Sequence, residues 1–257
     1  MEPTLQLFLI VLPAVFLAGL VDSIAGGGGL LSVPAYMAAG LPPHYVLGNN
    51  KFSSSFGTLF ATLRYHQHGL IDVPVAMISA LFALGGSFLG ANAVLLIDPA
   101  FLRYLLIVLI PVLTLFTLAN RSLGRVNNSR RQPRKRKYSL AALAALLIGF
   151  YDGFFGPGTG TFLILFYTLA LKYDFVTANA NTKVVNLASN VAALAAFIIN
   201  GKIIYAIGIP AAAAGIAGNL LGAKLVIKRG SSIIRPIFIL ALALLFIKIV
   251  YDMVTTG

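Results

Sequence analysis

The chain has 257 residues, of which 59% are hydrophobic and 10% are charged, and it contains no cysteine. A soluble domain of this length cannot bury so much apolar side chain, so the composition predicts an all-α integral membrane protein without a soluble domain. The lack of cysteine excludes disulfides and thiolate chemistry. The three histidines and seven acidic residues are too scattered to suggest a metal site.

The net charge of +12 is concentrated in one connection between two apolar runs. Eight of the nineteen lysine and arginine residues lie there: Arg121, Arg125, Arg130, Arg131, Arg134, Lys135, Arg136 and Lys137. Short basic loops between membrane helices stay in the cytoplasm, so residues 120–138 are predicted to be a cytoplasmic linker. Contact with anionic lipid headgroups is a second interpretation, and nucleic-acid binding is not expected.

Apolar segments recur along the chain, most of them near the length of about 20 residues that a helix needs to cross a bilayer core. The predicted segments before the linker are 5–25, 30–39, 49–67, 73–97 and 101–119. Those after the linker are 139–155, 161–171, 176–199, 203–227 and 233–254. The second segment of each series is too short to cross as an upright helix. The first segment lacks a basic n-region, so we expect it to be retained rather than cleaved as a signal peptide.

One stretch of the sequence occurs twice. Its first copy contains Asp22, the glycines 26–29 and the triplet Asn49-Asn50-Lys51, and its second contains Asp152, a Gly-x-Gly-x-Gly run at 156–160 and Asn181-Thr182-Lys183. The acids and glycines match at an offset of 130 residues, and the triplets match at an offset of 132. The repetition predicts two homologous halves, residues 1–119 and 139–257. Because each half has five segments, an odd number, the second half is predicted to be inverted, with both termini outside.

An inverted repeat with short or Gly-interrupted segments at matching places is typical of secondary transporters. A helix that begins inside the bilayer presents free N–H groups and the positive end of its dipole, which attract an anion. Glycines let the backbone approach closely, and lysine and amide side chains add donors. The candidate substrate-binding residues are Gly26, Gly27, Gly28, Gly29, Asn49, Asn50, Lys51, Gly156, Gly158, Thr159, Gly160, Asn181, Thr182, Lys183 and Asn186.

Several of these residues have a second interpretation. Asp22 and Asp152 either cap a turn or pair with a lysine to hold the loops, or they carry a proton. Lys51 and Lys183 lie near the predicted segment starts, so snorkelling to the membrane surface is an alternative. Glycines in membrane helices mostly serve close packing, which we expect for Gly85, Gly86, Gly90, Gly215, Gly218 and Gly222.

Neither glycine cluster is a nucleotide-binding loop. No βαβ context surrounds them, and neither ends in Gly-Lys-Ser/Thr. No G-x-S-x-G or H-E-x-x-H motif is present either, and we expect no cofactor and no enzymatic activity.

The two motif copies resemble the paired repeats of the TauE/SafE sulfite-exporter family. The stretch from Gly19 to Pro34 with Asn49-Asn50-Lys51 is similar to the first repeat, and the stretch from Gly149 to Gly160 with Asn181-Thr182-Lys183 is similar to the second. The resemblance covers nearly the whole chain and is strongest to the YfcA-like branch. It implies a multi-pass permease of the bacterial inner membrane for small sulfur-containing anions such as sulfite, sulfonates or sulfoacetate, often in the export direction.

The sequence therefore predicts an alternating-access transporter of small anions, with an anion channel as the alternative and an intramembrane enzyme as a weaker one. The expected partners are the anionic substrate and membrane lipids, and the features are compatible with a homo-oligomer.

Overall fold

The computed structural model describes residues 5–93, 124, 126–154 and 156–256, and within these ranges the chain is helical with no β-strand. The helices are α1 (Leu5–Ala25), α2 (Gly29–Ala38), α3 (Pro43–Gln67), α4 (Val73–Ala93), the 3-10 helix η1 (Ser129–Arg131), α6 (Arg134–Phe154), α7 (Thr159–Leu169), α8 (Phe175–Ile199), α9 (Tyr205–Arg229) and α10 (Ser231–Thr256). The all-α prediction is confirmed. The predicted segment 101–119 lies outside the described residues.

Two helices begin five or six residues earlier than their apolar patterns predict. α3 begins at Pro43, where the fixed φ of proline and its missing N–H suit the first helical position, rather than at residue 49. α6 begins at Arg134, so the last residues of the predicted linker form its first turn. The Asn49-Asn50-Lys51 triplet consequently lies inside α3 and not at its start.

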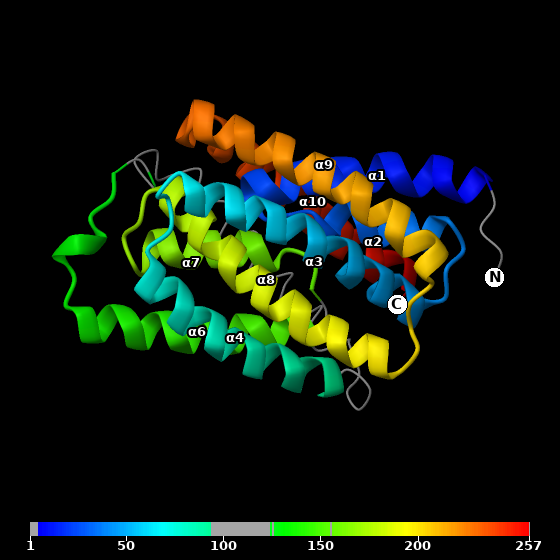
Figure 1. Ribbon diagram of the computed structural model, residues 1–257, viewed down its shortest axis with the longest axis horizontal. Helices are drawn as coiled ribbons and strands as arrows, with labels where there is room; N and C mark the ends of the chain where they lie inside the picture. Colours follow the sequence, from blue (N-terminus) through cyan, green and yellow to red (C-terminus); the bar gives the residue numbers. More distant parts are fainter. Residues whose placement is uncertain (1–4, 94–123, 125, 155, 257) are drawn as a thin grey trace.

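Helices of the N-terminal half (residues 5–93) pack against helices of the C-terminal half (residues 134–256). α1 packs against α9, and α4 packs against α6. α3 contacts α8 and α9, while α8 also contacts α4. Figure 1 shows these helices running largely along the long axis, with η1 and the start of α6 at the left-hand end and the start of α1 at the right. The most extensive helix packing is therefore between the two halves.

Small residues allow this close packing of helices from different halves. A Cβ at Gly86 of α4 would overlap the carbonyl oxygen of Leu146 on α6, and one at Gly218 of α9 would overlap that of Phe16 on α1. Gly85 differs from the expectation, because a Cβ there has no described atom within 4 Å. The packing role that the sequence suggested for the glycines of α4 therefore applies to Gly86 but not to its neighbour.

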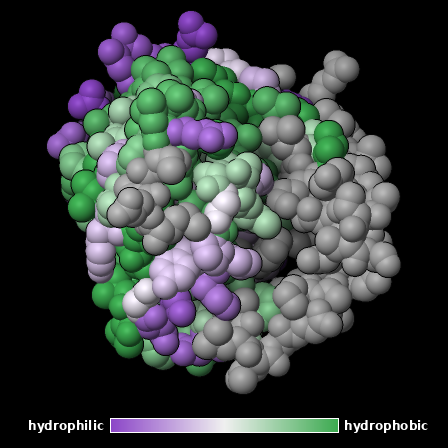
Figure 2. Space-filling model, turned by 90° about the vertical axis from the view of Figure 1, so that its right-hand side faces the viewer, coloured by the Kyte–Doolittle hydropathy of each residue, from purple (hydrophilic) through white to green (hydrophobic). Residues whose placement is uncertain are grey.

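The flanks of the helices carry many exposed large hydrophobic side chains, including Leu81 (68% exposed) on α4 and Leu147 (60%) on α6. Figure 2, viewed from the end where α8 connects to α9, shows such side chains in green along the described flank, with hydrophilic side chains in separate patches. Among the described residues, α1, α4, α8 and α9 are long and apolar enough to cross a membrane. An apolar surface of this extent indicates a lipid environment.

A polar cluster outside these helices joins three segments near the start of α6. Lys137 Nζ lies 3.0 Å from Asp72 Oδ2, and the hydroxyl of Tyr173 donates to the same oxygen at 2.6 Å. Burial by itself raises the pKa of Asp72, but the hydrogen bonds from Tyr173 and Lys137 outweigh it and hold the pKa below its ordinary value. This contact therefore stabilises the fold at pH values above the ordinary pKa of an aspartate. Its contribution is lost as the pH falls through the folded-state pKa.

The neighbouring glycines of α4 give a matched test of the helix packing. Gly86→Ala forces a methyl group into the backbone of α6, and overpacking of this kind costs roughly 1 to 3 kcal/mol. We expect it to lower the thermal unfolding temperature of the detergent-purified protein, whereas Gly85→Ala leaves that temperature unchanged or raises it. Equal effects of the two substitutions would contradict the described contact between α4 and α6.

Candidate functional site

Two interrupted helices build the centre of the molecule. α1 ends at Ala25 and α2 begins at Gly29, while α6 ends at Phe154 and α7 begins at Thr159. Three glycines in the connections have positive φ, namely Gly26 (78°), Gly156 (90°) and Gly158 (87°). Side chains with a Cβ rarely adopt this conformation, so glycine is required for the chain to reverse at these points.

The two glycine loops, 26–28 and 156–158, lie against each other across the halves. A Cβ at Gly160 would lie 2.5 Å from Cα of Gly26 and 2.7 Å from its carbonyl oxygen, so no larger residue fits there. The Thr161 hydroxyl donates to the carbonyl oxygen of Ala25 at 3.1 Å. The N-terminal ends of α2 and α7 are thereby brought to one place.

A cavity of about 30 Å³ lies where the loops meet α3 and α8. Its volume has room for water or a very small ion, so a larger anion requires it to widen. Its lining is drawn from both halves and consists of Asp22, Gly26, Gly29, Asn50, Lys51, Ser54, Asp152, Gly156, Gly158, Thr159, Gly160, Asn186 and Asn190. We call it the central cavity.

Lys51 of α3 is the lysine that lines the central cavity. Its ammonium group lies 2.8 Å from Asp152 Oδ2, on α6, and donates to Asn190 Oδ1, on α8, at 3.0 Å. The hydroxyl of Ser189 donates to the same Asp152 oxygen at 2.5 Å. The side chains of both ions are more than nine-tenths buried. Lys51 therefore has a fixed position at the cavity wall, and its charge is compensated by the other half of the molecule.

Lys183 forms the equivalent pair with the roles of the halves exchanged. Its ammonium group lies 3.0 Å from Asp22 Oδ2 and also donates to the Asp22 carbonyl oxygen, at the end of α1. The Lys183 side chain has no exposed surface and is not part of the cavity lining, whereas Asp22 lines the cavity. The two pairs are thus equivalent by sequence but different in access.

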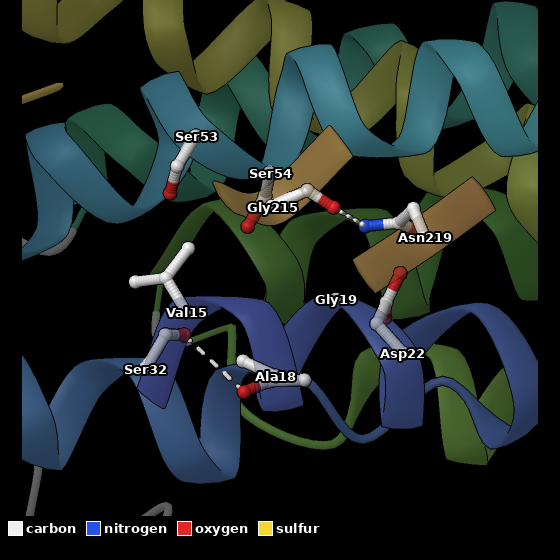
Figure 3. A pocket seen from close by; sticks show the side chains of 10 residues that line it. Val15, Ala18, Gly19, Asp22, Ser32, Ser53, Ser54, Gly215 and Asn219 are labelled. Atoms are coloured by element: carbon white, nitrogen blue, oxygen red, sulfur yellow. Dashed lines mark hydrogen bonds between the residues drawn. The ribbon is translucent and has the colours of Figure 1, made fainter. Parts of the chain in front are cut away.

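A second, smaller cavity of about 20 Å³ lies on the other side of Asp22, between α1, α3 and α9. In Figure 3 the Asp22 carboxylate points from α1 toward α9, where Asn219 donates to the Gly215 carbonyl oxygen at 3.0 Å. Asp22 and Ser54 line both cavities. Asp22 therefore lies on the boundary between the two spaces.

Electrostatically, the central cavity combines fixed charges with helix ends. Gly29, Thr159 and Gly160 lie in the first turns of α2 and α7, where the positive ends of the two helix dipoles point at the cavity, although the N–H of Thr159 itself donates to the Gly156 carbonyl oxygen. These helix ends favour negative charge, as does Lys51. The carboxylates of Asp22 and Asp152 oppose them, so the two lysines and two aspartates sum to zero formal charge.

Most of the candidate residues meet at the central cavity, but six of them do not line it. Gly28 lines the second cavity instead, and Lys183 is enclosed. The amides of Asn49 and Asn181 donate to backbone carbonyls one turn earlier in their helices. The other two are Gly27 and Thr182. Snorkelling of Lys51 and Lys183 was the wrong alternative, because both lie inside helices and pair with an aspartate.

The candidate substrate-binding residues of the sequence analysis do not include Ser54, Ser189 and Asn190. Ser54 matches Asn186 at the offset of 132 residues, and Asn190 follows Asn186 by four positions, which places both on one face of α8. Those two relations were available in the sequence. Ser189 matches Gly57, so the repeat contained no signal for it, and its contact with Asp152 depends on the packing of α6 against α8.

A helical bundle with an apolar exterior and a small polar cavity at two interrupted helices defines the class of transmembrane transporters. The chain belongs, more particularly, to the TauE/SafE family: the profile described as Sulfite exporter TauE/SafE matches its residues 11–249. This confirms the resemblance in the motifs.

The relatives of the chain have transporter names. The probable membrane transporter protein YfcA of Escherichia coli strain K12 is 35% identical over 238 residues, which cover 92% of this chain and 87% of that protein. The probable membrane transporter protein of Haemophilus influenzae is 35% identical, with 92% of each chain covered. The probable membrane transporter protein YdhB of Bacillus subtilis is 24% identical over 84% of this chain and 89% of its own length. No solved structure matches the chain.

The enclosed pair gives a prediction about stability. Lys183→Met leaves the Asp22 carboxylate without its counter-charge, and breaking a buried pair costs roughly 3 to 5 kcal/mol. We expect a large fall in the thermal unfolding temperature of the purified protein, and partial recovery when Asp22→Asn is added. The measurement is a double-mutant cycle. Additive losses in the double variant would show that the two side chains do not stabilise each other.

Proposed function

We propose that this protein is a secondary transporter of small anions that binds its substrate in the central cavity and works by alternating access. The observation that carries the proposal is the convergence, at one cavity, of two helix N-termini and a lysine, all of which favour negative charge. The substrate then lies between the halves, so that movement of one half against the other opens the cavity to one side at a time.

The exchange of partners between the halves supports an inverted repeat. The contact of α1 with α9 has its counterpart in that of α6 with α4, and the pair of Lys51 with Asp152 has its counterpart in that of Lys183 with Asp22. Residues related by the sequence offset thus occupy related contacts. Such reciprocity is expected of two halves related by a pseudo-two-fold axis.

For the substrate we propose a sulfur-containing oxyanion or organosulfonate. The family description names sulfite, and the lining offers donors of the kind that bind oxyanions, namely the Lys51 ammonium group, the amide of Asn50 and the hydroxyl of Ser54. The Asp152 carboxylate, which pairs with Lys51, has two oxygens, whereas a sulfonate spreads its charge over three and can accept from several donors at once.

We further propose that the protein lies in the bacterial inner membrane with residues 120–138 in the cytoplasm. The described part of this linker keeps Arg130, Arg131 and Arg134 exposed, in positions to contact anionic headgroups. The positive-inside rule is the physical basis of this orientation.

The transport function can be measured with reconstituted protein. We expect saturable uptake of labelled sulfite or sulfoacetate into proteoliposomes, with acceleration when unlabelled anion is present inside, as for a carrier and unlike a channel. Lys51→Ala removes the cationic group from the cavity wall, so uptake should fall by at least about tenfold, the effect of losing one charged hydrogen bond of roughly 1.5 to 3 kcal/mol. Anion flux that is not accelerated by unlabelled anion inside the vesicles would favour an anion channel over a carrier.

The control for that experiment is Lys202→Ala. Lys202 lies between α8 and α9 with its ammonium 5.6 Å from the ring centre of Tyr45, outside the central cavity. The Lys202→Ala substitution removes the same charge as Lys51→Ala and should leave uptake unchanged. Equal loss in both variants would contradict the placement of the substrate at Lys51.

The orientation gives a separate prediction. A reporter fused after Gly257 should be active only in the periplasm, and one inserted near Arg130 should be active only in the cytoplasm, because the halves are inverted and the linker is basic. Activity of both reporters on the same side of the membrane would contradict the five-plus-five inverted arrangement, whatever the substrate is.

A further inference from the structure

An anion that enters the central cavity meets a lysine, Lys51, that is already paired with the Asp152 carboxylate. Two of the three N–H donors of Lys51 are directed to Asp152 Oδ2 and Asn190 Oδ1. The third donor can reach an anion, but the Asp152 carboxylate already compensates the charge of Lys51, so an anion binds Lys51 strongly only in competition with Asp152. The neighbouring pair offers no substitute, since Lys183 is enclosed by Asp22 and does not line the cavity.

Charge balance decides what must accompany the anion. The two lysines and two aspartates around the cavity sum to zero, so a bound monoanion adds one uncompensated negative charge. An uncompensated charge in a buried site is expensive, and the repulsion between the anion and Asp152 adds to the cost. One proton on Asp152 removes both problems, because it makes the carboxyl group neutral and releases Lys51 to the anion.

Resting on the transport function proposed above, we propose that Asp152 is the proton-binding site of this protein and that it couples one proton to each monoanion through competition for Lys51. The proton comes from the solution to which the cavity is open and adds to a carboxylate oxygen of Asp152. It leaves to the solution on the other side together with the anion, after which Asp152 and Lys51 pair again. No bond other than this O–H bond forms or breaks.

The surroundings of Asp152 agree with a neutral acid at this position. The Ser189 hydroxyl, which donates to the carboxylate, can rotate to accept from the protonated acid. α4, which packs against α6, has no titratable side chain. The titratable side chains that line the central cavity together with Asp152 are Asp22 of α1 and Lys51 of α3. Tyr151 precedes Asp152 on α6, and the adjacent helices α7 and α8 carry Tyr167 and Lys183. The tyrosines donate to the Pro157 carbonyl and to Ser79, and Lys183 is held by Asp22, which leaves Lys51 as the charge directly paired with Asp152.

The coupling predicts a measurable proton uptake. The probe is ethanesulfonate, a monoanion whose own charge does not change near neutral pH, added to detergent-purified protein in weakly buffered solution with a pH indicator dye. We expect about one proton taken up per anion bound, and an anion Kd that rises with pH by up to about tenfold per unit, because the two ligands are linked reciprocally. Calorimetry in buffers of different ionisation enthalpy measures both quantities together.

The variants separate this proposal from simpler ones. In Asp152→Asn the anion should still bind, without proton uptake and with a Kd independent of pH. Asp72→Asn, at the ion pair near the start of α6, should keep the proton uptake of the unmodified protein.

Each other outcome has a definite meaning. Anion binding without proton uptake, or with sodium required in its place, would overturn the coupling and leave the transport function intact. Proton uptake that persists in Asp152→Asn would assign the proton to a different group. If ethanesulfonate, sulfite and sulfoacetate all fail to bind at any pH, the transport function proposed above is itself wrong.

Discussion

The structure depends on two reciprocal ion pairs that cross between the halves. Lys51 reaches Asp152 and Lys183 reaches Asp22, each over a span of more than one hundred residues in the chain. A buried charge without a partner is costly, so each half needs the other in order to bury the lysine of its own polar triplet. The same requirement brings the ends of the interrupted helices together, and with them the glycine loops that leave room for a cavity.

The two pairs resemble each other in sequence but not in surroundings, and this difference assigns their roles. Lys183 is enclosed and bonds to both the carboxylate and the backbone of Asp22, as a structural contact does. Lys51 lies at the cavity wall and shares its donors between Asp152 and Asn190. In a transporter built from two equivalent halves, a static structure is expected to hold one half's pair more open than the other's. The asymmetry therefore belongs to the proposed mechanism as much as to the fold.

Much of this arrangement could be predicted from residues alone. Hydrophobic content indicated a membrane protein, and the spacing of apolar runs located α1 and α8 to within a residue. The repeated motifs identified the family, the glycine loops and most of the cavity lining, because breakers and charges inside apolar segments are rare unless they have a function. Helix starts were less accurate. α3 begins at a proline several residues before the polar triplet, and α6 begins in the basic linker, and neither start is marked by a hydrophobic period.

What the sequence by itself determined is which residues are exceptional: an acid, a glycine loop and an amide–lysine triplet, each present twice. Which of them contact each other was decided only by the tertiary structure. The sequence allowed Lys51 to extend to the membrane surface or to pair with either aspartate, and α3 packing across to the C-terminal half selected Asp152. Ser189 enters the site for the same reason. The helix pattern of a chain is local, whereas the compensation of a buried charge depends on where another, distant helix comes to lie.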